Sequence, residues 1–491
     1  MKFLCFNPSY KLRQDGNRVI LYGDDDDEYD AEDWYSYIHP YHAMMFSFFK
    51  GKDPREAENK RFADYFGISE NDATKIVDSY IADERKTIHV HDKCYFFPKN
   101  TLIERDVPFG NVSSFDYSAS DFKYLGEPDI YSMRASFPVS INMELTMKCY
   151  VDCCYCYANR CIQKNGQMST EEVVKFIKYA RKAGVLNLDI NGGEVLLHPG
   201  IVEIVKTLYE CGYKPLISTK MPVDAKMLEE LKSWGMRNYQ ISLDAANDNV
   251  LHELINSKQG YLKSIRKTLQ NSEELGLKVN INTVLTNINC DVKILRELFD
   301  FINQFNCVKT VRLNVCGYSL YKDNYKKIRP SQHQVFEVEE FINSGIRDTL
   351  KFRIVMAGYD KADDYCQEKR ASIFEDRAIC TGNLRNLVVL PNGDVTICEE
   401  LYDNPHFLIG NILQSSLEEI WNSEKARNLL YNPCNRKSNS NCTHCDSYQS
   451  CRPRVGVCWK TVLMAYGKEN WDYPDPRCPK GPQPYNEFFI R

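Results

Sequence analysis

The feature that most restricts the fold of this chain is a regular alternation of strand and helix patterns from Phe137 to about Gly317. Such alternation is typical of parallel βαβ units. One helix begins with the capping box Ser169-Thr170-Glu171-Glu172, and another is predicted over Val292–Phe305. Six strands are predicted, at Pro138–Leu145, Leu186–Ile190, Lys214–Ser218, Asn238–Ser242, Lys278–Leu285 and Thr310–Val315. We therefore expect a partial (β/α)6 TIM-like barrel, whose functional residues follow the carboxyl ends of the strands.

The cysteines of the chain indicate metal binding. The 491 residues include 20 cysteines, and the N-terminus lacks the pattern of a secretory signal peptide. We expect a cytoplasmic protein, in which disulfides are rare and clustered cysteines bind metal. A formal net charge of −5 argues against non-specific nucleic-acid binding, and no apolar run predicts a membrane span. The isolated cysteines are expected to be small buried hydrophobes: Cys5, Cys94, Cys211, Cys290, Cys307 and Cys316.

Three cysteines follow the first predicted strand at a spacing that suits one iron–sulfur cube. Cys149, Cys153 and Cys156 can each bind one iron of a [4Fe–4S] cluster and leave the fourth iron without a protein ligand. A structural zinc site is the alternative, but such sites use four ligands and seldom this spacing. The open iron makes this loop the predicted reactive centre.

The stretch from Leu145 to Tyr157 resembles the radical S-adenosylmethionine (SAM) superfamily, and the resemblance spans the barrel. It implies that the open iron binds the amino and carboxylate groups of SAM. It also implies that the reduced cluster cleaves SAM to methionine and a 5′-deoxyadenosyl radical, which abstracts hydrogen. Tyr155 would then pack near the adenine, whereas Cys154 and Cys161 have no assigned role.

Further positions resemble the superfamily's SAM contacts. Gly192, Gly193 and Glu194 match its GGE motif, 36 residues after Cys156, and the carboxylate would pair with the SAM ammonium. Ser242 and Asp244 resemble its Ser-x-Asp, for which an ordinary strand-end turn is the alternative. Related enzymes often carry an arginine beyond this point that pairs with the SAM carboxylate, but the stretch Leu254-Ile255-Asn256 has none. The remaining candidates are Ser218, Asn282 and Leu313.

The C-terminal cysteines resemble the SPASM extension of the same superfamily. The departure is a spacing of six residues between Cys451 and Cys458, where the family usually has three. Eight thiolates would fully ligate two further [4Fe–4S] cubes. The resemblance implies one auxiliary cluster near the active site, held by Cys366, Cys380, Cys398 and Cys458. It implies a distal cluster held by Cys442, Cys445, Cys451 and Cys478.

Three questions stay open in this region. Cys434 competes with Cys366 for the eighth place, and a site left open would let a substrate thiol bind iron. Zinc is the alternative for the group around Cys442, because Cys-x2-Cys is a common zinc half-site. Glu399 directly follows Cys398, where sulfatase-maturating relatives have an acidic general base. Glu399 is therefore the catalytic candidate, and an exposed glutamate beside a structural cysteine is the alternative.

Residues 1 to about 85 suggest a small winged-helix module, with helices predicted at Ala31–Phe49, Pro54–Tyr65 and Glu70–Ala82. The acidic run Asp24–Glu28 is most simply a solvated loop. Many radical SAM/SPASM enzymes use such a module to bind a leader peptide, which adds a strand to its sheet. A DNA-binding winged helix is the alternative, but the third helix is acidic. A metal site at His89 and His91 is the alternative to two surface histidines.

These observations predict an α/β chain with five parts: a leader-peptide recognition module (1–85), a linker (86–136), the barrel (137–350), a SPASM domain (351–480) and a tail (481–491). The expected activity is thioether formation, from a cysteine sulfur to a carbon, in a ribosomally made precursor peptide, as in sactipeptide and ranthipeptide maturases. A formylglycine-generating sulfatase maturase, another peptide-crosslinking or epimerising enzyme, and a non-catalytic regulator are the alternatives. The expected cofactors are SAM and three [4Fe–4S] clusters. The expected partners are the precursor peptide and a flavodoxin- or ferredoxin-type electron donor, without nucleic acid or membrane.

Overall fold

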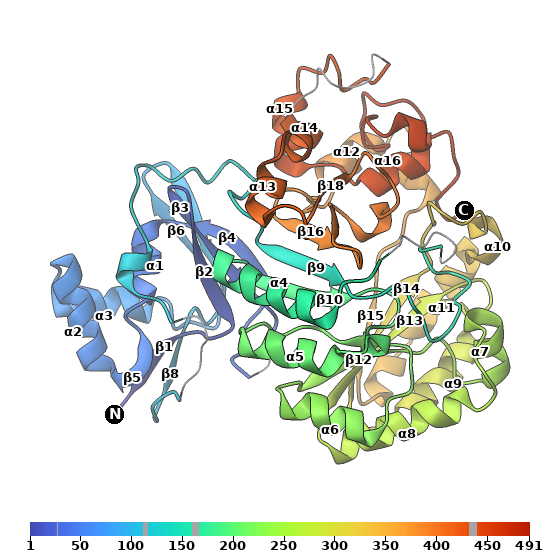
Figure 1. Ribbon diagram of the computed structural model, residues 1–491, viewed down its shortest axis with the longest axis horizontal. Coiled ribbons are helices and arrows are strands. Elements are labelled where there is room, and N and C mark those ends of the chain that lie inside the picture. Colours follow the sequence, from blue (N-terminus) through green and yellow to red (C-terminus); the bar gives the residue numbers. More distant parts are fainter. Residues whose placement is uncertain (27, 111–115, 160–165, 432–438) are drawn as a thin grey trace. The chain divides into compact units, whose positions relative to one another are not determined.

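The computed structural model describes residues 1–26, 28–110, 116–159, 166–431 and 439–491, and its contacts divide into two compact units (Figure 1). The N-terminal unit contains Met1–Val139, Ala180–Leu186 and Glu210–Gly212. The C-terminal unit contains Ser140–Tyr179, Asn187–Tyr209 and Tyr213–Arg491. Every predicted site residue except those of the recognition module belongs to the C-terminal unit.

The N-terminal unit consists of short antiparallel strands and three helices. Its sheets have the orders β5-β1-β8 and β2-β3-β4, and β6 pairs with β7. Aromatic side chains such as Phe46, Tyr95 and Phe97 fill its core. The strands are β1 (Phe3–Phe6), β2 (Tyr10–Asp15), β3 (Arg18–Gly23), β4 (Trp34–Ile38), β5 (Lys50–Pro54), β6 (Lys86–Val90), β7 (Lys93–Phe97) and β8 (Leu102–Arg105). The helices are α1 (Pro40–Phe46), α2 (Arg55–Phe66) and α3 (Glu70–Asp78).

The helix predicted over Ala31–Phe49 is wrong, because this segment forms strand β4 and then helix α1. The run Trp34-Tyr35-Ser36-Tyr37-Ile38 is rich in residues that favour strands, and β4 pairs with β3 over its whole length. Pro40 occupies the first position of α1, where its missing N–H costs no hydrogen bond. Helices α2 and α3 each begin within one residue of the predicted start.

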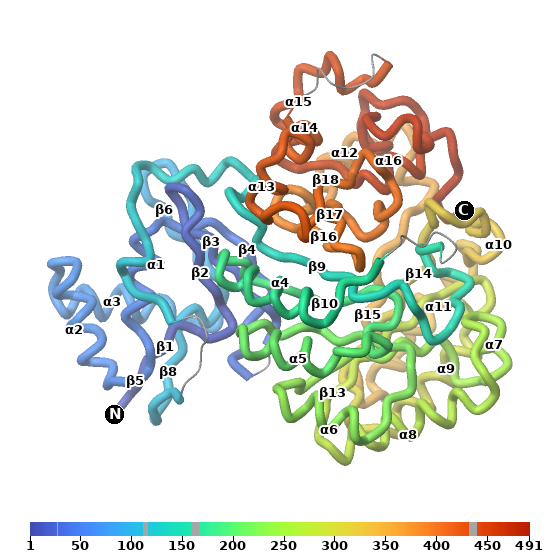
Figure 2. The backbone as a smooth tube through the Cα atoms, viewed as in Figure 1, coloured from blue at the N-terminus to red at the C-terminus, as the bar shows by residue number. Residues whose placement is uncertain are grey.

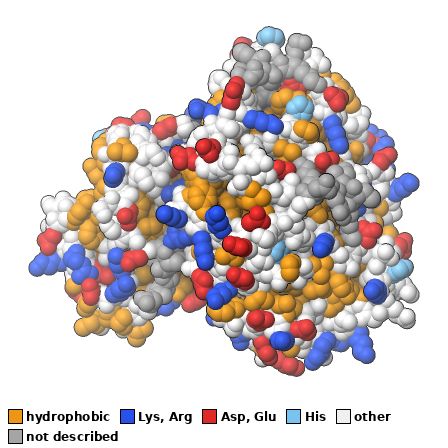
Figure 3. Space-filling view, viewed as in Figure 1, with side chains coloured by type: hydrophobic (Ala, Val, Ile, Leu, Met, Phe, Trp, Pro, Cys, Tyr) orange, Lys and Arg blue, Asp and Glu red, His pale blue; other side chains and the backbone are white. Residues whose placement is uncertain are grey.

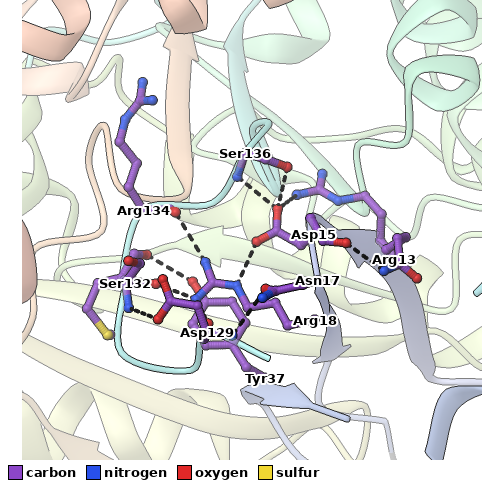
Figure 4. A network of polar contacts seen from close by, with 12 residues as sticks. Arg13, Asp15, Asn17, Arg18, Tyr37, Asp129, Ser132, Arg134 and Ser136 are labelled. Atoms are coloured by element: carbon purple, nitrogen blue, oxygen red, sulfur yellow. Dashed lines mark hydrogen bonds and ion pairs between the residues drawn. The ribbon is translucent and has the colours of Figure 1, made fainter. Parts of the chain in front are cut away.

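The predicted linker, residues 86–136, folds as part of the N-terminal unit over its described residues. Strand β8 pairs with β1 from Phe3↔Arg105 to Phe6↔Leu102. Arg18 binds the last part of the segment, as Figure 4 shows. Its guanidinium donates hydrogen bonds to the carbonyls of Asp129 and Ser132, and it also pairs with Asp15 at 2.9 Å. The linker prediction is therefore corrected, because the pairing of β8 with β1 and the hydrogen bonds from Arg18 to the Asp129 and Ser132 carbonyls hold the segment in place.

The C-terminal unit is built on parallel strands with flanking helices (Figure 1). One sheet has the order β11-β12-β13-β14-β15 and the other the order β10-β9-β16-β17-β18. The barrel strands are β9 (Ser140–Glu144), β10 (Asn187–Asn191), β11 (Ser218–Thr219), β12 (Asn238–Ser242), β13 (Lys278–Leu285), β14 (Val308–Val315) and β15 (Arg353–Met356). The helices of this part are α4 (Thr170–Ala183), α5 (Ile201–Glu210), α6 (Ala225–Ser233), α7 (Asp248–Ile255), α8 (Tyr261–Glu274), α9 (Val292–Ile302), α10 (Tyr325–Ile328) and α11 (Gln332–Asn343).

The α/β fold with a parallel core confirms the predicted fold class, and the bounds of β12 and β13 are those predicted. Strand β11 differs from its prediction. A strand was expected over Lys214–Ser218, but only Ser218 and Thr219 pair with β12. The side chains of β13 alternate between buried and partly exposed along the strand. Such alternation is the pattern that predicts a strand most directly.

The region after the barrel continues one of its sheets, as Figure 2 shows beside β9. Strand β16 (Asn386–Val389) runs parallel to β9, and β17 (Asp394–Thr396) and β18 (Leu408–Asn411) extend the sheet in antiparallel fashion. The helices that follow the barrel are α12 (Arg370–Glu375), α13 (Leu417–Asn422), α14 (Glu424–Tyr431), α15 (Tyr448–Val455) and α16 (Trp459–Tyr466). The cysteine-rich region is thus joined to the barrel by backbone hydrogen bonds.

The segment predicted as a tail, residues 481–491, packs against this unit. Phe488 and Ile490 are each 1% exposed, and the Ile490 N–H donates to the Asp360 carbonyl at 3.1 Å. The tail prediction is corrected for that reason. Among the residues that the structure describes, no helix combines the length and the apolar composition needed to cross a membrane. On the face shown in Figure 3, acidic and basic side chains lie interspersed.

Candidate iron–sulfur and SAM site

The GGE segment lies directly against the loop that carries the first three cysteines. The Gly193 N–H donates to the Thr146 carbonyl at 2.7 Å, and the Glu194 N–H donates to the Lys148 carbonyl at 2.7 Å. A β-carbon at Gly193 would stand 2.1 Å from the Lys148 carbonyl oxygen and 2.9 Å from the Cys149 sulfur. Glycine is therefore required here by the approach of the cysteine loop.

Glu194 is 3% exposed, and its carboxylate accepts four hydrogen bonds. The donors are the Thr219 hydroxyl at 2.9 Å and the N–H groups of Lys220, Met221 and Leu196 at 2.9, 3.2 and 3.3 Å. Burial raises the pKa of Glu194, and the hydrogen bonds oppose that shift. The carboxylate is thereby fixed between the end of β10 and the end of β11.

A second buried group joins Tyr155, Lys220 and Asp244. The Lys220 ammonium lies 2.7 Å from Asp244 Oδ2 and 2.7 Å from the Tyr155 hydroxyl, which itself donates to Asp244 at 2.5 Å. Asp244 is fully buried and accepts from the Val284 N–H at 2.9 Å. Burial opposes the charge of Lys220, but Asp244 and the Cys153 and Cys156 thiols together outweigh it and raise the pKa of the lysine. Lys220 was not predicted from the sequence, because a lysine after a strand is usually solvated.

The polar candidates of the parallel strands share one face, and Leu313 does not. In the register Ser218 aligns with Gln240 and Ser242 with Asn282, so their side chains point to the same side. The Ser218 hydroxyl accepts from Gln240 at 2.8 Å, and Asn314 donates to Asn282. Leu313 aligns with Thr283 instead and is fully buried on the opposite side. The structure therefore groups the two serines with Asn282 and leaves Leu313 apart.

Two of the three cysteines of the first loop, Cys153 and Cys156, lie close enough to act on each other electrostatically. Burial raises the pKa of the Cys153 thiol to about 11; nearby Lys220 opposes the shift, and Cys156 adds to it. Among the described residues, no three His, Cys, Asp or Glu side chains converge as ligands of a single ion. The ligands of a cube bind separate irons and therefore stand apart.

Three of the four cysteines predicted for the nearer auxiliary cluster lie together. Burial raises the pKa of Cys380 to about 11, and the neighbouring Cys458 adds to that shift. The pKa of Cys398 is raised by burial and, among its other neighbours, by the same Cys458. Cys366 is not among the neighbours that shift these two thiols in the part of the chain that the structure describes; its backbone hydrogen-bonds to Asp363, Lys369 and Arg370. Cys434 lies outside the described residues.

The four cysteines predicted for the distal cluster form a second group. Burial raises the pKa of Cys478, and Cys442, Cys451 and Cys445 add to the shift. Basic side chains point at three of the sulfurs: Arg377 at Cys451 (3.2 Å), Arg452 at Cys442 (3.4 Å) and Lys480 at Cys445 (3.8 Å). Arg452 is 1% exposed, and its Nε and Nη1 atoms have no partner among the described residues. Unpaired buried donors beside thiols fit an anionic cluster.

Glu399 and a second glutamate that the sequence reading missed lie close together. Glu399 is partly buried and accepts from Asn191 at 2.8 Å and from Asn142 at 3.3 Å. Glu144, the last residue of β9, is 2% exposed, and its Oε1 atom has no partner among the described residues. Burial first, and then Glu399, raise the pKa of Glu144 to about 8. Glu144 lines a small cavity together with Met147, Leu390 and Tyr402. In the sequence, only the position of Glu144 at the end of a predicted strand could have indicated that it belongs to the site.

Comparisons with known proteins agree with this site. Residues 143–298 match the Radical SAM superfamily, and residues 380–446 match the iron-sulfur cluster-binding domain SPASM. The chain is 25% identical over 299 residues to the antilisterial bacteriocin subtilosin biosynthesis protein AlbA of Bacillus subtilis, covering 60% of this chain and 61% of AlbA. This chain thus spans less than two thirds of the length of AlbA. It is also 25% identical over 350 residues to the mycofactocin maturase MftC of Mycobacterium tuberculosis, covering 70% of this chain and 83% of MftC.

Solved structures show a likeness of fold over nearly the whole chain. Streptococcus suis SuiB bound to S-adenosylmethionine has a TM-score of 0.63 at 16% identity, covering 96% of this chain and 99% of that chain. SuiB bound to precursor peptide SuiA has a TM-score of 0.62 at 15% identity, covering 97% and 100%. The chain thus carries one segment that matches the Radical SAM superfamily and another that matches the SPASM domain, on a fold like that of SuiB. The cofactors that these domain matches support are SAM and [4Fe–4S] clusters.

Proposed function

We propose that this enzyme installs a thioether crosslink, from a cysteine sulfur to a carbon, in a ribosomally made precursor peptide. The observation that carries the proposal is the extent of the fold likeness: SuiB bound to its precursor peptide matches the N-terminal unit as well as the two iron–sulfur domains. The names of AlbA and MftC, a biosynthesis protein and a maturase, point to the same kind of chemistry.

The residues of the C-terminal unit divide the work as follows. Cys149, Cys153 and Cys156 hold the reactive cluster, and the two SPASM cysteine groups hold two more, which makes three. When bound, SAM supplies a 5′-deoxyadenosyl radical that abstracts hydrogen from the substrate. Glu194 holds the ammonium of SAM, with Tyr155 and Asp244 beside it. Glu399 would accept the proton that the substrate thiol loses when its sulfur bonds to the carbon radical, and an auxiliary cluster would have to accept the one electron that this bond releases.

The N-terminal unit binds the leader of the precursor by adding the leader as a strand to one of its sheets. Holding the leader raises the local concentration of the core peptide at the barrel. A flavodoxin- or ferredoxin-type protein in the cytoplasm reduces the reactive cluster. This arrangement explains why small antiparallel sheets accompany a barrel that already contains the SAM site.

Mass spectrometry of the modified precursor tests the bond. A thioether removes two hydrogens per crosslink and keeps every sulfur, whereas formylglycine formed from cysteine loses the sulfur. Blocking the cysteines of the precursor with iodoacetamide before the reaction should abolish the modification. A two-hydrogen loss that survives this blocking would show a carbon–carbon crosslink and overturn the thioether assignment.

Leader dependence is tested with the intact enzyme. A precursor without its leader should be modified slowly, while SAM cleavage to 5′-deoxyadenosine persists, and adding the free leader should restore only part of the rate. Equal rates with and without the leader would favour the second candidate, a sulfatase-type maturase. That candidate is supported by the acidic residue Glu399 directly after Cys398.

A further inference from the structure

The SAM site described above has acceptors for cationic groups but no arginine for the carboxylate of SAM. Glu194 and Asp244 are both buried acidic residues. The stretch Leu254-Ile255-Asn256, where related enzymes often carry that arginine, ends helix α7 without a basic residue. The question is therefore which side chain of this protein meets the carboxylate.

Lys220 is held rigidly between the two acidic residues. Its N–H donates to Glu194 Oε2 at 2.9 Å, and its ammonium lies 2.7 Å from Asp244 Oδ2. The Tyr261 hydroxyl donates to the Lys220 carbonyl at 2.7 Å, which fixes the backbone from the other side. The lysine side chain is 14% exposed. A cation that is fixed by its surroundings loses little entropy when it binds a ligand.

The ammonium of Lys220 retains a donor for a ligand. An ammonium has three N–H bonds, and two acceptors engage it among the described residues, Asp244 and the Tyr155 hydroxyl. The lysine also lies near the thiols of the first cluster, because Cys153 and Cys156 both act on it electrostatically. A free N–H on a buried cation at the cluster loop is suited to an anionic ligand.

We propose that Lys220 binds the carboxylate of SAM in place of the missing arginine. An α-amino acid carries its ammonium and its carboxylate on the same carbon, so its site needs an anion and a cation side by side. Residue 220 provides this arrangement, because its N–H holds the Glu194 carboxylate while its side chain presents the cation. The inference depends on SAM binding alone and not on the proposed peptide chemistry.

Two other lysines of the region are weaker candidates. Lys322 donates to the Cys153 carbonyl at 3.4 Å, a backbone contact that does not involve an acidic residue of the site. Lys148 is exposed. An exposed lysine gains little from a charge pair because water screens it. Lys322 is accordingly the matched control for the experiment.

Equilibrium dialysis on the anaerobically reconstituted enzyme, with its clusters oxidised so that SAM is not cleaved, tests the proposal. The two probes are SAM and decarboxylated SAM, which differ only in the carboxylate. Lys220→Met should weaken SAM binding by about tenfold or more, as expected for a hydrogen bond to a charged group. Its affinity for decarboxylated SAM should stay within about twofold of the wild type, because the pairwise contact is absent there.

The double variant Lys220→Met/Asp244→Asn separates ligand binding from structural damage, because it leaves no unpaired buried charge. It should keep the selective loss for SAM. Equal losses for both probes in both variants would show that Lys220 only stabilises Asp244 and would overturn the proposal. A selective loss in Lys322→Met instead would overturn it as well. No peptide enters the measurement, so either failure leaves the proposed function untouched.

Discussion

At the scale of single residues, the site contains buried carboxylates, and hydrogen bonds offset the cost of burying them to very different degrees. Glu194 accepts four hydrogen bonds, and Asp244 pairs with Lys220, whereas Glu144 has one oxygen without a partner among the described residues. A buried carboxylate is tolerated when donors surround it and is costly when they do not. Glu144 is therefore the acid of the site whose burial is least offset by donors among the described residues.

Glu194→Gln should weaken SAM binding at least about tenfold, because a charge-assisted hydrogen bond is worth about 1.5–3 kcal/mol. Glutamine retains the shape of the side chain and one oxygen for the N–H groups after β11. The variant thus removes the charge and leaves the fold. Glu203→Gln, an exposed position on α5, is the control. A SAM titration that gives the same affinity for both variants would contradict the assignment of Glu194.

Glu144→Gln should stabilise the protein increasingly as the pH rises. The pKa of Glu144 rises from its ordinary 4.5 to about 8 in the folded state. Between these values the native protein binds more protons than the unfolded chain, so Glu144 lowers stability progressively as the pH rises through that window. The glutamine variant escapes this cost, and its Tm should exceed that of the wild type by at least about 2 °C near pH 8.5 and by less near pH 6. A difference in Tm between the variant and the wild type that does not change with pH would contradict the raised pKa of Glu144.

At the scale of elements, close approach of backbone segments decides where the cofactor loop lies. Gly193→Ala would bring a methyl group to 2.1 Å from the Lys148 carbonyl, so the cysteine loop must move. We expect loss of the first cluster, and with it about one third of the iron, while the SPASM clusters remain. Gly358→Ala is the control, because nothing lies within 4 Å of its β-carbon position. Iron analysis and electron paramagnetic resonance read the outcome, and a full first cluster in Gly193→Ala would contradict it.

Local patterns predict the elements that depend on local chemistry. The alternation along β13 and the N-cap residue Ser69 of α3 were readable from the sequence. The strand β4 was missed because aromatic residues followed by Pro40 suit either a helix or a strand until β3 offers a partner. Strand β8 and the Arg18 network were missed because pairing with a segment about a hundred residues away leaves no local signal.

The site shows the same division. The cysteine loop, the GGE motif and the Ser-x-Asp could be proposed from the sequence because their spacing is local. Glu144 and Lys220 were missed, because their significance comes from burial and from partners on other strands. Leu313 lies on the opposite side of the sheet from Asn282, and the sequence does not reveal which face of β14 a residue occupies before the register is known.

At the scale of the whole molecule, the cysteines form separate groups although they interleave along the chain. Cys458 lies between Cys451 and Cys478 in the sequence but is near enough to Cys380 and Cys398 to raise the pKa of both thiols. This interleaving ties the segment after β18 to β16 and β17, so the clusters and the fold of this region should depend on each other. Seven of the eight predicted auxiliary ligands fall into the two groups, and Cys366 is the one that the described contacts do not include.

The iron content of variants shows whether Cys366 or Cys434 is the eighth ligand of the auxiliary clusters. Three complete cubes hold about twelve irons, and replacing Cys149, Cys153 and Cys156 together by Ala should remove about four and abolish SAM cleavage. Cys366→Ala and Cys434→Ala then form a matched pair. If Cys366 completes the nearer auxiliary cluster, its removal should lower the iron content or convert the cluster spectrum, while Cys434→Ala leaves both unchanged. The opposite result assigns the place to Cys434.

If neither single variant changes the cluster, its fourth iron is open, and adding a peptide thiol should perturb the spectrum of the wild type and of both variants alike. Retention of SAM cleavage after loss of the first three cysteines would contradict the assignment of the reactive cluster.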